Sequence, residues 1–393
     1  MLRRGARAWI CAGAALALLA APAASQAGDP PLRISVPKPS GRFEVGTRAL
    51  LMVDASRQDT PGSPGPRRLM VQVTYPRAER GRCRPSPYIS RGVMAILASA
   101  VALDRPTGIA TGVCRGGRIA NGVHPALVFS HAFTADRFVY ASLVNDLASR
   151  GYIVVAPDHP PDAFAIEYPG GEVVDGEYGR PLTPAEITPA QIAELNELRT
   201  DDVRFVLSRT LELGRRSGGF LAGHVDGRRV GVLGHSLGGS TAAHAAQVGS
   251  RFDAAADLDG SLFGGWTART GDRTPLLLLA AAGGVGAGFA EQPLCDYMAA
   301  LGGPRFALDL EGALHFSYSD FQALAPAIAA ADPGWPFAGL YQAVVGTIDP
   351  QRSITAQRRA LARFFARYVK DKDVPRLRPF GPFSRIPLRG CAG

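Results

Sequence analysis

The sequence predicts an α/β fold in which a mostly parallel central sheet carries helices on both faces, with lid-like insertions between the elements. Short apolar runs alternate along the chain with longer helix-forming segments, and this alternation is typical of parallel sheets. No internal repeat is evident. A length of 393 residues suits one large domain with insertions.

The expected elements follow in chain order. A β-hairpin is predicted first, because apolar strands at 49–53 and 69–75 flank a loop rich in Gly and Pro. Short apolar runs then predict strands and longer periodic segments predict helices. These are a helix at 92–103, a strand with its loop at 125–133, a helix at 139–150, a strand at 153–156, a long helix at 189–213, a strand at 230–234 with a helix at 240–246, and strands at 252–260, 274–280 and 305–310.

The most informative stretch is the apolar strand 230–234, which runs into Gly-x-Ser-x-Gly around Ser236 and then into an Ala-rich segment. A strand, a sharp turn carrying a serine, and a helix form the nucleophile elbow of α/β-hydrolases. The glycines remove Cβ atoms that would clash in the tight turn. The alternative is a Gly-rich turn with an incidental serine. The context favours the elbow, so Ser236 is the predicted nucleophile.

A serine hydroxyl is a weak nucleophile at neutral pH and needs a histidine base with a carboxylate that orients it. In this fold the three residues follow in the order Ser, Asp or Glu, His. His315, just after the predicted strand 305–310, is the only histidine downstream of a plausible acid. The sequence therefore predicts His315 as the base, with an ordinary surface or core histidine as the alternative.

The candidate acids lie at the end of the predicted strand 252–260. Asp259 stands at its carboxyl end, where the sites of open parallel sheets collect, and Asp257 lies two residues deeper on the same face. The next strand offers no carboxylate before Glu291. We take Asp259 as the triad acid and Asp257 as the fallback, while a strand-end Asp that caps a turn is equally compatible with the spacing.

The tetrahedral intermediate needs two preorganised backbone N–H donors. One comes from the residue after the serine, Leu237, and the other from the loop after an earlier strand. The strand at 125–129 and its loop supply Phe133 as the candidate second donor. His131, in the same loop, is interpreted as a residue buried under the site floor.

Residues 1–27 have the features of a secretory signal peptide. Arg3, Arg4 and Arg7 precede an apolar run at 8–20 and a small-residue stretch at 21–27, which predicts cleavage near Ala27 and a secreted or periplasmic protein. An uncleaved anchor is the alternative. Residues 28–393 are then a single catalytic domain, whose tail at 371–393 is rich in Pro and Arg.

Charge and motifs limit the partners. The net charge of +9 comes almost wholly from arginines scattered along the chain, which argues against a nucleic-acid groove. A mildly basic surface favours transient contact with anionic lipid headgroups. No motif for a metal or an organic cofactor is present, so none is expected.

Four cysteines follow the signal segment, and in an exported chain they suggest two disulfides with three possible pairings. We favour Cys83 with Cys114, which closes an insertion, and Cys295 with Cys391, which ties the tail to the body. Free or metal-binding thiols are the alternative, but no Cys-x-x-Cys spacing supports a metal site.

Three insertions are expected to shape specificity. The segment 92–103 is apolar nearly all round and too short to span a bilayer, so it is a buried helix or an interface-docking element, and burial is favoured. The loop 160–188 carries acids and glycines and suits a rim. The segment 261–274, directly after the acid, is a candidate wall of the acyl pocket or an ordinary surface loop.

Four short motifs stand out together, namely Phe129 to Arg137 with Asp146 to Val154, Gly234 to Gly239, Leu258-Asp259-Gly260, and His315 to Phe321. They resemble the secreted and type II platelet-activating-factor acetylhydrolases, α/β-hydrolases that cleave short or oxidised sn-2 acyl chains from phospholipids. The resemblance spans roughly residues 45–325, and the 23-residue separation of Ser236 from Asp259 fits it, which favours Asp259 over Asp257.

One departure from that family concerns the oxyanion loop. Where the family usually has Ser-His-Gly-Leu, this chain has Ser130-His131-Ala132-Phe133, so a Cβ and a bulky ring are expected to narrow the acyl pocket.

The predicted function is a secreted serine ester hydrolase that acts on short-chain or phospholipid sn-2 acyl esters. A cutinase, a polyester hydrolase or a lipase of the same fold is an alternative, and so is an acyltransferase. A catalytically silent relative used for binding is the alternative from another class.

Overall fold

The computed structural model describes residues 31–59, 65–103, 107–176, 188–248, 251–260, 271–281 and 291–386, with side chains described from 296 onward in the last range. It does not describe the expected signal peptide at 1–27 or residues 261–270 of the expected acyl-pocket wall. The second expected disulfide also lies outside the description, which omits the side chain of Cys295 and all of Cys391.

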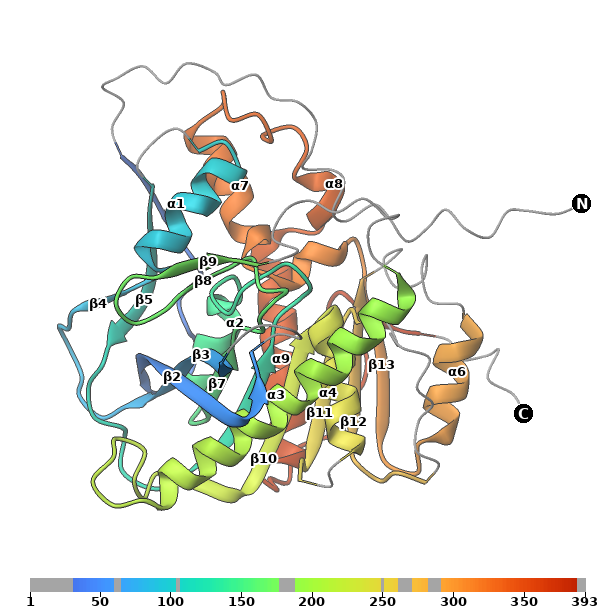
Figure 1. Ribbon diagram of the computed structural model, residues 1–393. Coiled ribbons are helices and arrows are strands. Elements are labelled where there is room, and N and C mark those ends of the chain that lie inside the picture. Colours follow the sequence, from blue (N-terminus) through green and yellow to red (C-terminus); the bar gives the residue numbers. More distant parts are fainter. Residues whose placement is uncertain are drawn as a thin grey trace, which may run out of the picture.

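The described residues build a twelve-stranded sheet in which six neighbouring strands, β7, β6, β10, β11, β12 and β13, run parallel (Figure 1). Its strand order is β1-β5-β2-β3-β7-β6-β10-β11-β12-β13-β14, and β4 pairs with β5. The bounds are β1 Leu32–Ser35, β2 Glu44–Gln58, β3 Pro66–Arg77, β4 Pro85–Pro87, β5 Thr107–Arg115, β6 His124–Ser130, β7 Ile153–Pro157, β10 Val225–His235, β11 Ala254–Leu258, β12 Leu276–Ala281, β13 Arg305–Leu310 and β14 Phe383–Arg385.

Helices cover both faces of this sheet, and successive residues of one buried strand show which helices pack on each face. Leu127 and Phe129 of β6 pack with α2 and α9, whereas Ala126 and Val128 pack with α3 and α4, because neighbouring side chains of a strand point to opposite faces. The bounds are α1 Arg91–Ala100, α2 Ala141–Ser149, α3 Pro189–Arg215, α4 Leu237–Gln247, α6 Glu291–Ala300, η2 His315–Tyr318, α7 Phe321–Ala331, α8 Gln342–Val345 and α9 Pro350–Tyr368.

The expected elements up to β13 are present with boundaries shifted by a few residues. The hairpin is β2 paired antiparallel with β3, and the long helix α3 begins at a capping box in which Thr188 and Gln191 satisfy each other's backbone N–H groups. Three helices after β13, namely α7, α8 and α9, were not predicted. No helix among the described residues combines the length and apolar character that a membrane crossing requires.

A cap of α1, α7 and α8 lies over one end of the sheet (Figure 1). The expectation that the segment at 92–103 is a buried helix holds only in part, because Val93 is the fully buried residue of α1 and its other described positions are partly or fully exposed. Val93 packs in one cluster with Leu324 and Ile328 of α7. Other apolar residues of the segment are partly buried against the same cluster, namely Met94, Ile96, Leu97, Ala102 and Leu103. The loop expected as a rim contains the small hairpin of β8 Ala165–Glu167 and β9 Val173–Asp175.

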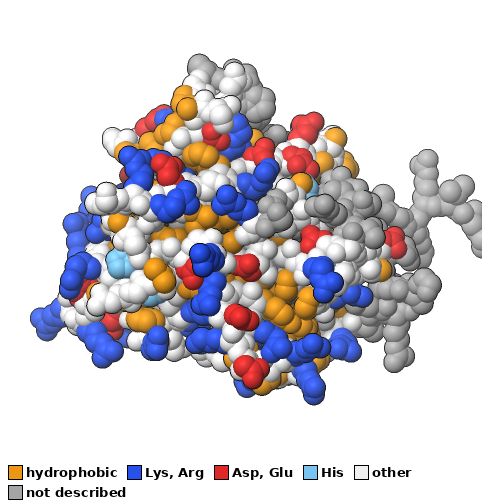
Figure 2. All heavy atoms as spheres, turned by 90° about the horizontal axis from the view of Figure 1, so that it is seen from below, with side chains coloured by type: hydrophobic (Ala, Val, Ile, Leu, Met, Phe, Trp, Pro, Cys, Tyr) orange, Lys and Arg blue, Asp and Glu red, His pale blue; other side chains and the backbone are white. Residues whose placement is uncertain are grey.

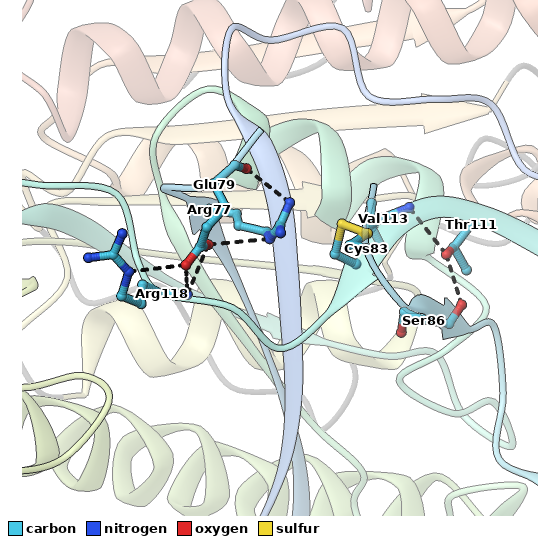
Figure 3. The surroundings of a disulfide bond; sticks show 8 residues. Arg77, Glu79, Cys83, Ser86, Thr111, Val113 and Arg118 are labelled. Atoms are coloured by element: carbon cyan, nitrogen blue, oxygen red, sulfur yellow. Dashed lines mark hydrogen bonds and ion pairs between the residues drawn. A yellow bond between two sulfur atoms is a disulfide. The ribbon is translucent and has the colours of Figure 1, made fainter. Parts of the chain in front are cut away.

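A disulfide joins Cys83 to Cys114, the pair that the sequence analysis favours, with Cα atoms 5.7 Å apart (Figure 3). It fastens the chain before β4 to the end of β5. Glu79 bridges Arg77 and Arg118 beside it, so covalent and ionic contacts together hold this edge of the sheet.

On the face seen from below (Figure 2), charged side chains of the described residues are spread out and do not form a patch of one sign. Figure 2 shows Lys and Arg scattered over one face among acidic and apolar side chains. This distribution agrees with the spread of arginines along the sequence.

Candidate active site

Ser236 lies between the end of β10 and the start of α4 in a backbone conformation that few residues adopt. Its φ and ψ are 57° and −124°, and its N–H donates to the carbonyl of Leu258 at 2.9 Å. A non-glycine residue with positive φ is strained unless the surroundings hold it. The side chain is partly exposed, so the turn presents a reachable hydroxyl at the carboxyl end of a central strand.

The glycines of the elbow allow strand and helix to approach closely. A Cβ at Gly238 would overlap the carbonyl oxygens of Ser130 and His131, and a Cβ at Gly234 would overlap the carbonyl of Gly238. These contacts are with backbone, which cannot rotate away. The Gly-x-Ser-x-Gly spacing thus follows from the packing of α4 against β6 and β10.

The structure brings Asp259 and His315 into direct contact. His315 Nδ1 lies 2.6 Å from Asp259 Oδ2, and the other carboxylate oxygen accepts the N–H of Ala281 at 2.8 Å. Asp259 is buried, whereas the side chain of His315 is 27% exposed. A carboxylate that accepts at Nδ1 fixes the proton there and leaves Nε2 available as a base.

Asp257, the fallback acid, has a different environment. Its Oδ1 accepts the N–H of Gly260 at 2.7 Å, and no described contact joins it to His315. Burial, together with the nearby charge of Asp259, raises the pKa of Asp257 well above its usual value. Burial therefore favours the neutral form of Asp257, whose Oδ1 supports the turn at Gly260.

The two candidate oxyanion donors emerge at the same edge of the sheet. Ser130 at the end of β6 pairs with Gly234 near the end of β10, so the loop with Phe133 and the helix start at Leu237 both follow the carboxyl ends of adjacent parallel strands. Leu237 is the first residue of α4, where a helix has no carbonyl of its own for the N–H.

His235 and Tyr140, which the sequence analysis did not single out, connect the oxyanion loop with His315. Tyr140 Oη accepts the N–H of Ala132 and donates to His235 Nδ1, both at 3.0 Å. His235 Nε2 donates to the carbonyl of His315 at 3.0 Å, and the rings of His235 and His315 pack with centroids 4.6 Å apart. Burial, with the neighbouring His315, holds the pKa of His235 well below its usual value, so this ring stays neutral.

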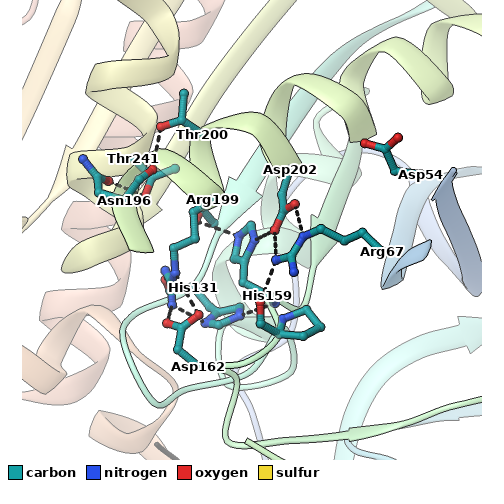
Figure 4. A network of polar contacts seen from close by, with 12 residues as sticks. Asp54, Arg67, His131, His159, Asp162, Asn196, Arg199, Thr200, Asp202 and Thr241 are labelled. Atoms are coloured by element: carbon teal, nitrogen blue, oxygen red, sulfur yellow. Dashed lines mark hydrogen bonds and ion pairs between the residues drawn. The ribbon is translucent and has the colours of Figure 1, made fainter. Parts of the chain in front are cut away.

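A buried Ser-His-Asp array starts from Ser130, the last residue of β6, and its His159 and Asp202 are labelled in Figure 4. Ser130 Oγ is 3.0 Å from His159 Nε2, and His159 Nδ1 is 3.0 Å from Asp202 Oδ2. All three residues are completely buried. Asp202 also receives Nε and Nη2 of the buried Arg67, each at 2.6 Å, which together with His159 lowers its pKa against the effect of burial.

This buried array is less suited to catalysis than Ser236. Ser130 belongs to the regular strand β6 and has no exposed surface, so an ester carbonyl could not reach its hydroxyl. Burial also lowers the pKa of His159. The array acts as a structural connection between β6, the loop after β7 and α3.

Two further features bear on ligands. A cavity of about 410 Å³ lined by Asp54, Phe205 and Phe252 lies away from the elbow, between β2, α3 and α4. Among the described residues no cluster of three or more His, Cys, Asp or Glu side chains is arranged to hold a metal ion.

Comparisons with known proteins agree on the family. Residues 107–213 and 219–376 match the family described as platelet-activating factor acetylhydrolase, isoform II. A protein of Arthroderma benhamiae named "Probable 1-alkyl-2-acetylglycerophosphocholine esterase" is 29% identical over 255 residues, covering 60% of this chain and 61% of that protein. The platelet-activating factor acetylhydrolase of Cavia porcellus is 27% identical over 160 residues, covering 36% of each chain. The matches thus span less than two thirds of either relative.

Among solved structures, the ferulic acid esterase from Streptomyces cinnamoneus superimposes with a TM-score of 0.70 and 31% identity, covering 87% of this chain and 94% of that one. This chain has the α/β-hydrolase fold and belongs to the platelet-activating factor acetylhydrolase isoform II family.

Proposed function

We propose that this protein is a secreted serine ester hydrolase that works through an acyl-enzyme on short-chain or phospholipid sn-2 acyl esters. The observation that carries the proposal is the contact of Asp259 with His315. The strained, partly exposed Ser236 lies at the same sheet edge, because its N–H donates to the carbonyl of Leu258, the residue before Asp259. The family match and the esterases among the similar proteins support the same reaction class.

In the proposed first half-reaction, Nε2 of His315 takes the proton of Ser236 Oγ as this oxygen attacks the ester carbonyl carbon. The carbonyl π electrons move to oxygen, and the amides of Phe133 and Leu237 stabilise the oxyanion. Asp259 stabilises the imidazolium. When the intermediate collapses, the C–O bond to the leaving alcohol breaks and His315 returns the proton to that alcohol.

Water completes the proposed cycle. His315 removes a proton from the water as its oxygen attacks the acyl carbon, and the same amides hold the second oxyanion. Collapse breaks the bond to Ser236 Oγ, which regains its proton from His315. The products are a carboxylic acid and the free enzyme, so the reaction balances without a cofactor.

The proposed substrate is inferred from two observations, the residues of the oxyanion loop and the names of the similar proteins. The fungal relative is named for an acetyl ester of a glycerophospholipid and the solved structure for ferulic acid. Ala132 and Phe133 stand where the family usually has smaller or more flexible residues, and Phe133 is partly exposed at the site edge. We propose that Phe133 narrows the acyl pocket and favours short acyl chains.

The direct test of function measures turnover of nitrophenyl esters with acyl chains of two to twelve carbons by the wild type and by Ser236→Ala. Turnover should be fastest for the shortest chains and should fall by several orders of magnitude in the variant. Unchanged turnover in Ser236→Ala would contradict the proposal. A silent binding protein would hydrolyse none of these esters.

A second set of substrates separates the related enzymes. The substrates are carboxylic esters that differ in acyl group, alcohol and physical state: a 1-alkyl-2-acetyl glycerophosphocholine, methyl ferulate, a triglyceride emulsion and a polyester film. We expect the acetyl phospholipid to give the highest kcat/KM. A preference for triglyceride or polyester would identify a lipase or cutinase instead, and ester products formed with added alcohol would indicate acyl transfer.

Export is part of the proposal and has its own test. The intact mass of the protein recovered outside the cytoplasm should correspond to a chain that begins close to residue 28. Recovery of the full-length chain in the membrane fraction would support an uncleaved anchor.

A further inference from the structure

The peptide unit that joins Ala132 to Phe133 is held from two directions by buried side chains that the mechanism above does not use. Its carbonyl oxygen accepts from His131 Nδ1 at 2.7 Å and from Arg199 Nη2 at 3.2 Å. Arg199 Nη1 donates to the preceding carbonyl, that of His131, at 2.5 Å. Figure 4 shows the side chains of Arg199, His131 and Asp162 close together.

The contacts of His131 determine which of its ring nitrogens carries the proton. The backbone N–H of His159 donates to His131 Nε2 at 3.1 Å, so Nε2 is an acceptor and Nδ1 carries the proton that reaches the Ala132 carbonyl. Burial, together with the positive charge of Arg199, holds the pKa of His131 well below its usual value. The ring is therefore a fixed neutral donor across the working pH range.

Arg199 is held as firmly as His131. It lies on α3 with no exposed surface, and its Nε donates to Asp162 Oδ1 at 3.2 Å, with a second ion pair between Nη2 and Oδ2. A buried arginine is costly unless carboxylate and carbonyl partners surround it. Here those partners are Asp162 and two consecutive carbonyls of the oxyanion loop.

A peptide unit is planar, and its C=O and N–H point in opposite directions. Because the carbonyl of residue 132 belongs to the same unit as the N–H of residue 133, fixing the first fixes the direction of the second. Donors on the carbonyl also polarise the unit and strengthen its N–H as a donor.

We propose that Arg199 and His131 are positioning residues that aim and polarise the Phe133 N–H at the oxyanion. This inference rests on the proposed esterase function and adds to it two side chains that never touch the substrate. The oxyanion exists only in the tetrahedral states. If the Phe133 N–H is no longer oriented toward it, kcat should therefore fall while KM stays nearly unchanged.

The experiment compares Arg199→Met with a matched control, Arg67→Met. Arg67 is also completely buried and paired with an aspartate, Asp202, but its other contacts are with the carbonyls of Asp59 and Pro160 rather than with the oxyanion loop. Both variants should lose stability, measured by thermal unfolding. Each is assayed below its melting temperature, with the concentration of folded protein determined.

Arg199→Met should lower kcat by about 10- to 100-fold, while KM changes less than threefold. This fall in kcat is no larger than the fall caused by removing one oxyanion donor completely. The variant should weaken inhibition by a trifluoromethyl ketone, which forms a tetrahedral oxyanion on the serine, by the same factor. Arg67→Met should change neither quantity more than threefold. Equal effects of the two arginine variants would show a purely structural role and overturn the inference.

His131 supplies a rescue test that does not involve a buried charge. His131→Asn keeps an N–H donor near the position of Nδ1 and should retain kcat within about fivefold, whereas His131→Leu removes the donor and should resemble Arg199→Met. Equal activity of His131→Leu and the wild type would overturn the proposal. If Ser236→Ala abolishes turnover while these variants behave like the wild type, only the positioning role is wrong, and the esterase function stands.

Discussion

Asp257 and Asp259 show how two residues of one strand end acquire opposite properties. Asp259 turns out of the strand with a φ of 52° and contacts His315. Asp257 remains in β11, where burial favours its neutral form. Of the two, only Asp259 has a described contact with His315, and this assigns the two carboxyl groups different consequences on mutation.

We expect Asp259→Asn to lower kcat by about three to four orders of magnitude, because the amide would hold His315 in the wrong tautomer. Asp257→Asn should keep activity within about threefold, since Asn resembles the neutral acid and still accepts the N–H of Gly260. Ester hydrolysis by both purified variants measures this. A larger loss in Asp257→Asn than in Asp259→Asn would reassign the acid.

Asp136 gives a pH-dependent prediction. It is buried and accepts the N–H groups of Phe138 and Val139, and burial, opposed by Arg137 but reinforced by Asp320, raises its pKa to about 6. The unfolded chain releases this proton near pH 4. The folded state therefore binds more protons between these values, and stability from this group falls as pH rises from about 4 to 6.

In Asp136→Asn the side-chain amide oxygen can still accept the backbone N–H groups of Phe138 and Val139, but the group cannot ionise. The variant should therefore not lose stability as the pH rises from about 4 to 6. Relative to the wild type, its free energy of unfolding should rise by on the order of 2 kcal/mol between pH 4 and pH 7. Urea unfolding at pH 4, 5, 6 and 7 measures the difference. Parallel pH profiles for the two proteins would argue against a raised pKa at this position.

At the scale of elements, the contact of α4 with β6 depends on Gly238. Gly238→Ala must push the helix away from the carbonyls of Ser130 and His131, which should destabilise the fold by roughly 1–3 kcal/mol and reduce kcat by displacing the Leu237 amide. Gly339→Ala is the control, because an added Cβ there meets nothing within 4 Å. Chemical unfolding and ester turnover of both variants test this, and identical behaviour would refute the close approach.

The disulfide between Cys83 and Cys114 encloses a separation of 31 residues, a loop whose closure is worth on the order of 3 kcal/mol in the chain-entropy account. The Cys83→Ser, Cys114→Ser double variant should unfold at lower denaturant concentration while its kcat stays near the wild-type value, because the bond lies at the far sheet edge. Denaturant unfolding with and without reductant measures the effect. No shift on reduction of the wild type would argue that the bond does not form.

The sequence predicted those elements whose pattern is local. The β2–β3 hairpin, the parallel strands around the elbow, and α3 each carry their own periodicity and turn residues. The elements α7 and α9 were missed because their apolar faces pack against elements formed by residues much earlier in the chain. The local sequence does not show that such a partner exists. The burial of α1 was overestimated because an apolar run does not reveal how many neighbours surround it.

At the scale of the whole molecule, contacts between distant segments could not be read from the sequence. Arg199 and Asp162 lie 37 positions apart, and the chain from Ala132 through Tyr140 and His235 to His315 joins three separate segments. Their residue types are common and carry no spacing signal. The pairing of Asp259 with His315 was predicted because the fold sets the chain order Ser, Asp or Glu, His, and because only His315 follows the acid at the end of the strand.

The buried array of Ser130, His159 and Asp202 makes the identity of the nucleophile the central claim. The partly exposed Ser236 should react, and the buried Ser130 should not. Incubation with an ethyl fluorophosphonate followed by proteolysis and mass spectrometry locates the adduct directly. The account predicts an adduct on the peptide containing Ser236, labelling of Ser130→Ala at the wild-type rate and no labelling of Ser236→Ala. An adduct on the Ser130 peptide, with Ser236→Ala still labelled, would contradict it.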